Sequence, residues 1–524
     1  MKRPTMSFSI KPRMMRMHHN KAVEAVSGMK YLGYAIVLEL MFLTACRPRP
    51  HNVTEVDALP DIYPDYVDVT VPAEIAPLNF AMADDSVSRV EVEVKGAKGG
   101  CITVNGRLAQ FSIGQWHRLL AGNRGSHLLV TVMALKDGQW IRYRTFKVFV
   151  SNDPLSDWGV TYRRVSPGYG MFSQMGLYQR ELSTFDEKAL LPNTQVSGMC
   201  VNCHTPNRAN PDQYTFHVRG RHGATVISRN GQIDLLAARN DSLGGSMVYP
   251  CWHPGGRYCA YSTNATSQMF HLAQNKRIEV FDRSSDIFIY DAETRTVLRD
   301  SLTMAAGWAE NCPAFSPDGK WLYYVSSPCQ PYPEGYNREK YSLCRVAFDA
   351  ETGRLGQQAD TLINAAQTGQ SVSWPRLSYD GRYLMYTQAD YGYFTIWHPE
   401  ADLWLMDLET GRRRKMDEVN SPRAESLHAW STDSRWFLFT SRREDGLYTL
   451  LYFSSIGPDG KATKPFLLPQ RNPRQYYRQS LFSFNTPDFT VRPVKTNLRH
   501  MGQLIESDRR AATGVVDLST TTDK

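Results

Sequence analysis

The stretch that decides the fold is Pro313-Ala-Phe-Ser-Pro-Asp-Gly-Lys-Trp-Leu-Tyr-Tyr-Val325. The same pattern recurs without a gap in three further places, which begin at Pro250, Pro375 and His428. Each copy reads as a strand, a tight turn and a second strand, and the Asp318-Gly319 pair supplies the residue tolerant of positive φ that such a turn needs. Self-similarity at a fixed period is typical of repeat architectures. The sequence therefore predicts a repeated supersecondary unit for this half of the chain.

A second recurring element completes the unit. It follows each of the first three copies and contains an aspartate (Asp291, Asp349 and Asp407) that is 58 residues from the next one, within an Asp-x-Glu-Thr-Gly turn in which Arg295 replaces the first glycine. Four strands per unit predict a blade of a β-propeller. Strand-like runs at 176–182, 214–219 and 479–484 supply further strands. We expect about six blades, the last closed by strands from both ends of the domain, because closure protects the edge strands.

The repeat also resembles a known family. Its core, Phe315-Ser-Pro-Asp-Gly-Lys-Trp321, is similar to the WD40-like repeat of TolB-type β-propellers of the bacterial envelope, over about residues 245 to 470. The resemblance implies a propeller that binds envelope proteins on one face, and it implies no specific activity. The order of segments resembles lipid-anchored TolB-like proteins in which a Cys-x-Asn-Cys-His insert precedes the regular blades. We therefore expect a propeller over 151–494 with an insertion at 190–212.

The remaining parts of the mature chain have different patterns. Between 66 and 150, short runs such as Val90–Val94 alternate apolar and polar residues, which predicts an Ig-like β-sandwich. From 495 to 524 the chain is polar, which predicts a flexible tail. The expected fold class is all-β, with the Ig-like β-sandwich followed by the propeller.

The N-terminus looks like a secretory leader. Residues 1–45 hold seven Lys/Arg and two Glu, so they contribute +5 of the formal net charge of +8, and the basic balance does not indicate nucleic acid. From Met29, the expected true start, Lys30 precedes an apolar run that ends in Leu43-Thr-Ala-Cys46. This ending resembles the lipobox of bacterial lipoproteins, in which the cysteine becomes the acylated first residue.

The resemblance implies that Cys46 anchors the mature chain to a membrane that it does not span. The alternative is a transmembrane anchor, but the run is too short for one. Residues 46–65, rich in proline and polar groups, then form a lipidated tether. We expect a monomer in the cell envelope, facing the periplasm, and exposure at the cell surface stays open.

One short motif implies specific chemistry. Cys200-Val-Asn-Cys203-His204 is a C-x-x-C-H, which is typical of c-type haem attachment, with two thioethers and His204 as the proximal iron ligand. The motif predicts one haem c. His217 is the nearest candidate for the sixth ligand, and the alternatives are Met199, His253 and His271. His253 also fits a simpler role, as a turn residue in place of the serine of other copies.

Three other interpretations of the motif stay open. Cys200 and Cys203 with His217 and His222 have the C-x2-C-x13-H-x4-H spacing of a zinc site. The two cysteines could also form a redox dithiol or a structural disulfide.

Signatures of enzymes are scarce in this sequence. It contains no G-x-S-x-G, no H-E-x-x-H and no P-loop motif. The acid pairs that begin at Asp291, Asp349 and Asp407 are better explained as turn residues than as catalytic dyads. The favoured hypothesis is an anchored protein-binding platform that carries a haem for electron transfer or redox sensing. The alternatives are a scaffold without haem and, as a weaker one, a haem enzyme.

Overall fold

The computed structural model of the chain describes residues 52–166, 169–237, 245–270, 278–479 and 481–518. The leader and Cys46 lie outside these ranges, and so does His271. Within the described part of the chain, no helix is long and apolar enough to cross a bilayer. Lipidation and export therefore stay predictions.

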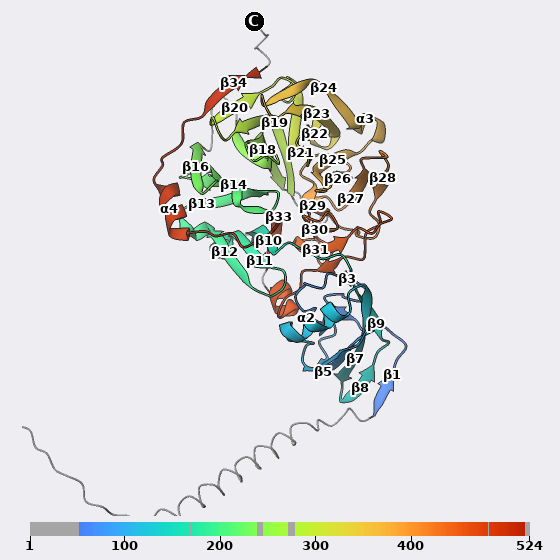
Figure 1. Ribbon diagram of the computed structural model, residues 1–524. Helices are drawn as coiled ribbons and strands as arrows, with labels where there is room; N and C mark the ends of the chain where they lie inside the picture. The colour runs from blue at the N-terminus through green and yellow to red at the C-terminus, as the bar shows by residue number, and fades with distance from the viewer. Residues whose placement is uncertain (1–51, 167–168, 238–244, 271–277, 480, 519–524) are drawn as a thin grey trace, which may run out of the picture. The chain divides into compact units, whose positions relative to one another are not determined.

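Five four-stranded sheets and one five-stranded sheet surround a common axis and form a six-bladed β-propeller (Figure 1). From the axis outward, blade 1 contains β33 (Ser483–Thr490), β10 (Gly159–Val165), β11 (Gly176–Glu181) and β12 (Glu187–Pro192); blade 2 contains β13 (Met199–Asn207), β14 (Asn210–Gly220), β15 (Ala224–Arg229) and β16 (Gln232–Ala237); blade 3 contains β17 (Ser246–Trp252), β18 (Tyr258–Phe270), β19 (Ile278–Asp291) and β20 (Thr296–Arg299). Blade 4 contains β21 (Trp308–Phe315), β22 (Trp321–Pro328), β23 (Ser342–Asp349) and β24 (Arg354–Ile363); blade 5 contains β25 (Ser371–Leu377), β26 (Tyr383–Ala389), β27 (Asp402–Asp407) and β28 (Arg413–Lys415); blade 6 contains β29 (Glu425–Trp430), β30 (Trp436–Ser441), β31 (Leu450–Ser455) and β32 (Phe466–Leu467). The prediction of six blades is confirmed.

Blade 1 closes the ring with strands from both ends of the propeller. Its innermost strand β33 pairs antiparallel with β10, although more than 300 residues separate them. This closure, which the sequence also predicted, joins the two ends of the propeller in one sheet, so β10 is not left as an edge strand.

The turns of the blades follow the predicted chemistry. Gly319 and Gly381 have φ of 73° and 75°, and Arg295 adopts φ 56° where the equivalent Gly353 has φ 74°. The carboxylate of Asp349 accepts a hydrogen bond from the backbone N–H of Glu351 at 2.9 Å. The same bond recurs from Glu293 to Asp291 and from Glu409 to Asp407. The acid pairs are therefore turn residues, as the sequence indicated.

Residues 52–150 contain one main sheet and a helix. The strands are β1 (Val53–Glu55), β2 (Ile62–Tyr63), β3 (Thr70–Val71), β4 (Ala81–Met82), β5 (Val87–Gly96), β6 (Cys101–Gly106), β7 (Ser126–Lys136), β8 (Gln139–Arg142) and β9 (Phe146–Val150). Within the main sheet β8, β7, β5 and β6 lie in that order, while β2 and β4 pair separately. Helix α2 (Ile113–Gly122) buries Trp116, Leu119 and Leu120 and contacts β5 and β6. The expected Ig-like sandwich is not confirmed, because this helix packs on the sheet.

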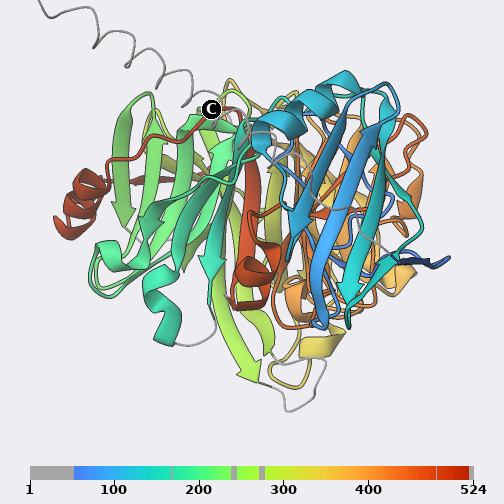
Figure 2. The ribbon, with the colours of Figure 1, turned by 90° about the horizontal axis from the view of Figure 1, so that it is seen from below.

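The segment after 494 differs from the expected flexible tail. It contains α4 (Leu498–Glu506), which buries Met501 and Ile505, and β34 (Gly514–Asp517), which pairs in parallel with β20. The red segment runs along the green blades (Figure 2). The apolar residues of α4 are four positions apart and so share one helix face, which explains why a mostly polar segment packs. A short helix, α3 (Ala365–Thr368), joins blades 4 and 5.

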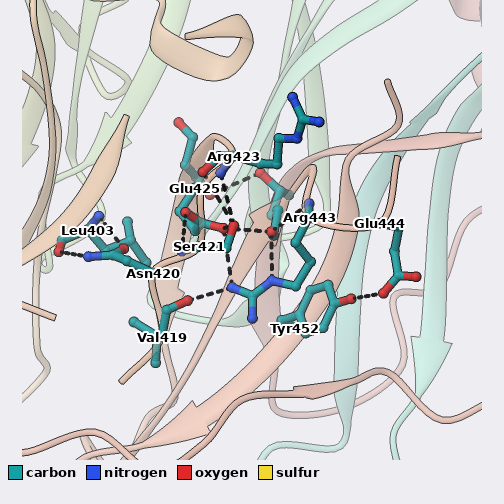
Figure 3. A network of polar contacts seen from close by, with 12 residues as sticks. Leu403, Val419, Asn420, Ser421, Arg423, Glu425, Arg443, Glu444 and Tyr452 are labelled. Carbon is teal, nitrogen blue, oxygen red and sulfur yellow. Dashed lines mark hydrogen bonds and ion pairs between the residues drawn. The ribbon is translucent and has the colours of Figure 1, made fainter. Parts of the chain in front are cut away.

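Two blades bury a glutamate at equivalent places on the innermost strand. Glu425 is fully buried, and its carboxylate accepts hydrogen bonds from the hydroxyls of Ser421 and Ser441. The same carboxylate forms an ion pair with Arg443 at 3.2 Å (Figure 3). Glu310 in blade 4 is 2% exposed, and its carboxylate oxygen Oε1 accepts a hydrogen bond from the hydroxyl of Ser326 at 3.4 Å. Burial raises the pKa of Glu310 to about 8 and that of Glu425 to about 7.

Candidate binding site at the centre of the propeller

Every innermost strand carries the same β-bulge. In each blade two consecutive residues lie opposite one residue of the neighbouring strand, and the first of the two has a positive φ between 41° and 54°. The six pairs are Cys203-His204, Tyr249-Pro250, Cys312-Pro313, Trp374-Pro375, Leu427-His428 and Thr486-Pro487. The second residue is proline in four blades and histidine in two, because a bulged residue leaves the ladder and needs no N–H partner.

The first bulge residues form a ring around the axis, which we call the axial ring: Cys203, Tyr249, Cys312, Trp374, Leu427 and Thr486. All of them except Leu427 line one cavity of about 30 Å³. Tyr249 packs edge to face against Trp374, with ring centroids 5.1 Å apart. Burial raises the pKa of the Cys312 thiol to about 12. The channel is thus narrow and largely filled by these side chains.

A second ring lies two residues further along each strand and forms the mouth of the channel. We call it the mouth ring: Thr205, Cys251, Ala314, Arg376, Ala429 and Asp488. All six residues line a cavity of about 100 Å³, and Thr205 and Arg376 also line the cavity of the axial ring. The two cavities are therefore stacked along the axis.

The mouth combines opposite charges with aromatic walls. Burial raises the pKa of Asp488 to about 6, and the positive charge of Arg376 opposes this rise. Trp430 donates its indole N–H to the carbonyl of Arg376 at 3.1 Å. The guanidinium of Arg208 lies 4.8 Å from the ring centroid of Tyr379. These contacts fix the walls and leave a small amphipathic hollow that fits a single side chain.

The C-x-x-C-H motif lies within this architecture and not in an insertion. Residues 199–207 form β13, where Cys200 pairs with Arg219 and Asn202 pairs with His217 of β14. The expected insertion at 190–212 is therefore corrected to the innermost strand of blade 2. Cys203 and His204 are simply the bulge of that blade, at the place where other blades hold a residue followed by proline.

The structure separates the two residues that a haem would need together. Cys203 lines the axial cavity, whereas His204 lines a different one, of about 40 Å³, with Leu177, Leu191 and Phe216. The imidazole Nε2 of His204 lies 3.1 Å from Thr161 Oγ1. Burial lowers the pKa of His204 to about 4. A cavity of about 150 Å³ holds one benzene ring. The residues around His204 therefore do not fit a haem.

The proposed sixth ligands are not directed at a common site. Met199 is buried in the apolar core of blades 1 and 2. His217 hydrogen-bonds Thr225 Oγ1 at 3.2 Å, and burial lowers its pKa to about 4. The imidazole Nε2 of His253 lies 3.1 Å from the carbonyl of Gly319. The backbone N–H of His253 donates to the carbonyl of Tyr258, just as the N–H of Ser316 donates to the carbonyl of Trp321 in blade 4. His253 is thus the turn residue of blade 3, which was its simpler interpretation.

The other interpretations of the motif do not fit either. His222 bonds the carboxylate of Asp508 at 2.9 Å, away from the two cysteines. Among the described residues, no three His, Cys, Asp or Glu side chains form a group that could hold a metal ion. Along a strand, Cα atoms three residues apart are separated by roughly 10 Å, which exceeds the roughly 7 Å limit of a disulfide between Cys200 and Cys203. Cys200 instead accepts a hydrogen bond from Arg163 at 3.3 Å.

The mouth ring was missed in the sequence, although a signal for it was present. The repeat copies begin at Pro250, Pro313, Pro375 and His428, which are the second bulge residues. Counting one residue onward in each copy gives the mouth-ring positions. The equivalence of His428 and proline also indicated that a histidine can occupy this place for structural reasons.

The likeness of this chain to known proteins is weak. No family model and no curated protein matches the chain. Solved structures similar to it include prolyl oligopeptidase B from Galerina marginata (11% identity, TM-score 0.31, 64% of this chain and 42% of that one), Synechocystis apocarotenoid oxygenase (11%, 0.36, 79% and 95%) and Kuenenia stuttgartiensis hydrazine synthase (9%, 0.39, 66% and 50%). The chain thus spans less than half the length of the first of these. At these scores, the likenesses carry no argument about function.

Proposed function

We propose that this protein is a lipid-anchored envelope protein of TolB-like type, without haem, that binds a partner protein at the mouth of its propeller. The observation that carries the proposal is the mouth ring. Residues from all six blades meet there, with Arg376 and Asp488 beside aromatic walls and a hollow of about 100 Å³. Buried aromatic and arginine groups dominate the binding energy of protein interfaces. A hollow of this size suits one anchoring side chain of a partner.

A crosslinking experiment tests the site of binding. A photoreactive amino acid at Tyr379, which lines the mouth, should capture a discrete partner in intact cells, whereas the same group at Trp308 should not. Trp308 begins β21, whose last residue Phe315 lines the mouth, so it lies about 23 Å away along the strand. The Arg376→Glu change should abolish the crosslink at Tyr379. Equal capture at both positions, or capture that survives Arg376→Glu, would refute the proposal.

The lipid anchor needs a separate test, because Cys46 lies outside the described residues. The proposal rests on the lipobox Leu43-Thr-Ala-Cys46. Replacing Cys46 by serine should prevent acylation and move the protein from the membrane fraction to the soluble fraction. Unchanged fractionation would show that another segment holds the protein at the membrane.

A further inference from the structure

Two arginines face the mouth cavity without a carboxylate partner in the described part of the chain. Arg208 and Arg376 both line the cavity of about 100 Å³, and no ion pair joins either guanidinium to a described acidic residue. Asp488 lines the same cavity, and the charge of Arg376 acts on it, but its carboxylate accepts a hydrogen bond from the backbone N–H of Phe489 at 2.9 Å. A second buried carboxylate, Asp157, acts on Asp488 but does not line the cavity. The lining therefore carries two positive charges and one negative charge.

The backbone places Arg208 over the mouth in an unfavourable conformation. Arg208 and Ala209 join β13 to β14 in a two-residue turn, and both have positive φ, 49° and 60°. Such turns usually contain glycine, asparagine or aspartate, because other side chains clash with the backbone there. From this turn of blade 2, the guanidinium of Arg208 donates a hydrogen bond to the carbonyl of Pro317 in blade 4 at 2.8 Å. It also lies 4.8 Å from the ring centroid of Tyr379 in blade 5, so the side chain reaches across the mouth.

The acidic residues of the turns beside the mouth are held within those turns. The carboxylate of Asp318 accepts hydrogen bonds from the hydroxyl of Ser316 at 2.5 Å and from the backbone N–H of Lys320 at 3.1 Å. Asp380 and Asp433 accept the equivalent bonds in blades 5 and 6. Because these carboxylates are bonded locally, the two arginines of the mouth stay available to a ligand.

We propose that the mouth binds a carboxylate of the partner protein, on an acidic side chain or at a chain terminus, between Arg376 and Arg208. This inference rests on the proposed binding function and names the group that the site recognises. A planar guanidinium forms paired, charge-assisted hydrogen bonds with a carboxylate. Trp430 and Phe315 line the same cavity, and apolar walls strengthen such bonds by lowering the local dielectric constant. A basic side chain would instead bring a third positive charge to the two arginines.

The sign of two charge changes tests the inference in intact cells, with the photoreactive group at Tyr379. At about pH 7.5, above the pKa of about 6 of Asp488, Arg376→Gln should lower capture of the partner and Asp488→Asn should raise it. The opposite signs would show that the mouth binds a basic group, and capture that neither change alters would show that charge is not recognised. Either result overturns the carboxylate and leaves the binding function standing, whereas the absence of capture in the wild type refutes the binding function itself.

A second measurement needs no variant and no known partner. Saturation-transfer NMR with the purified full-length protein compares butyrate with butyramide, which resemble the side chains of glutamate and glutamine, and N-acetylglycine with its amide, which resemble a free and a blocked chain terminus. At least one acid should bind about 10-fold or more tightly than its amide, and the pair that shows the preference identifies the source of the carboxylate. Equal binding of acids and amides, or binding of neither acid, would overturn the proposal.

Three arginine variants then locate the carboxylate. Arg376→Gln should remove the preference for the acid. Arg208→Gln should weaken binding of the acid by less than about 5-fold, because exposed ion pairs contribute little. The matched control is Arg338→Gln in the loop after β22, because β22 ends at Pro328 opposite Trp308, at the end of blade 4 away from the mouth. This variant should bind as the wild type does, and an equal loss in all three variants would contradict the site.

Discussion

Replacing Glu310 by glutamine should stabilise the protein at neutral and alkaline pH. The carboxyl is 2% exposed, and burial raises its pKa to about 8, against an ordinary value of 4.5. Below pH 4.5 the group is protonated in both the folded and the unfolded chain. Between pH 4.5 and about 8 it is charged only in the unfolded chain, so the wild-type free energy of unfolding falls as the pH rises. Above pH 8 it is charged in both states, and the loss levels off.

The magnitude follows from the two pKa values. At 1.36 kcal/mol for each tenfold change in proton affinity, the wild-type protein should lose roughly 3 to 4 kcal/mol between pH 5 and pH 8 through this group alone. Glutamine has no proton to lose, so Glu310→Gln should lack this part of the pH dependence. The variant should match the wild type near pH 5 and exceed it by a few kcal/mol near pH 8.

The matched control is Glu425→Gln in blade 6, at the equivalent position. There the carboxylate pairs with Arg443 (Figure 3), and glutamine leaves that arginine without its anionic partner. Breaking a buried ion pair from one side costs about 3 kcal/mol or more. Because Arg443 opposes the effect of burial and Glu425 has the lower pKa of the two, the gain in unfolding free energy at pH 8 should be smaller for Glu425→Gln than for Glu310→Gln.

Urea unfolding at several pH values, followed by tryptophan fluorescence, measures both effects. If Glu310→Gln and the wild type give parallel curves of unfolding free energy against pH, Glu310 ionises with an ordinary pKa and water reaches it. If Glu425→Gln is as stabilising as Glu310→Gln, Arg443 does not compensate the buried charge.

Three further predictions follow from the bulges and the C-terminal segment. His204→Pro should lower the free energy of unfolding by less than about 1.5 kcal/mol, because four blades hold proline at the equivalent position. His217→Pro, within the β14 ladder, should lower it by about 3 kcal/mol or more. Urea unfolding of the two variants measures this order, and the reverse order would contradict the bulge assignment. Expression with a cytochrome c maturation system should give no Soret band and no haem stain on a denaturing gel, while a stain that Cys203→Ser removes would show that β13 rearranges around haem. Truncation after 495 removes α4 and β34 and should lower the unfolding free energy by a few kcal/mol, at about 1.5 to 3 kcal/mol for each fully buried apolar side chain. A melting temperature equal to that of the full chain would show that the segment does not pack in solution.

The blades were predictable because their signals are local and repeated. The turn at Asp318-Gly319 and the aspartate spacing each act within a few residues, and four copies reinforce one another. Helix α2 also had a local signal, since Trp116, Leu119 and Leu120 lie on one face. That signal was outweighed by the alternating strands on both sides. The pairing of β34 with β20 was not predictable, because it joins segments more than 200 residues apart, and the residues that form the ion pair between the two strands, Arg299 and Asp517, carry no local signal in the sequence.

The C-x-x-C-H motif shows a different limit of sequence reasoning. Its residue types and spacing carry a strong chemical meaning, but the chemistry needs a compact loop in which Cys203 and His204 face one ligand. On a strand the two neighbours point to different sides, and the bulge directs Cys203 to the axis. The type of secondary structure around a motif thus decided its meaning, and that depended on the pairing of β13 with β14.

In each innermost strand, the bulge separates the residues whose backbone groups pair within the sheet from the first bulge residue, which lies outside this pairing. The first residue of each bulge leaves the ladder, so the hydrogen bonds within its blade do not depend on its side chain, while Cys312, Trp374 and Leu427 also pack in the apolar core. Cysteine, tyrosine, tryptophan, leucine and threonine all occupy this place in one chain. Substitution there changes what the channel offers without removing a backbone hydrogen bond. Single substitutions at the first bulge positions can therefore change the side chains at the centre of the propeller, while the architecture of the blades stays constant.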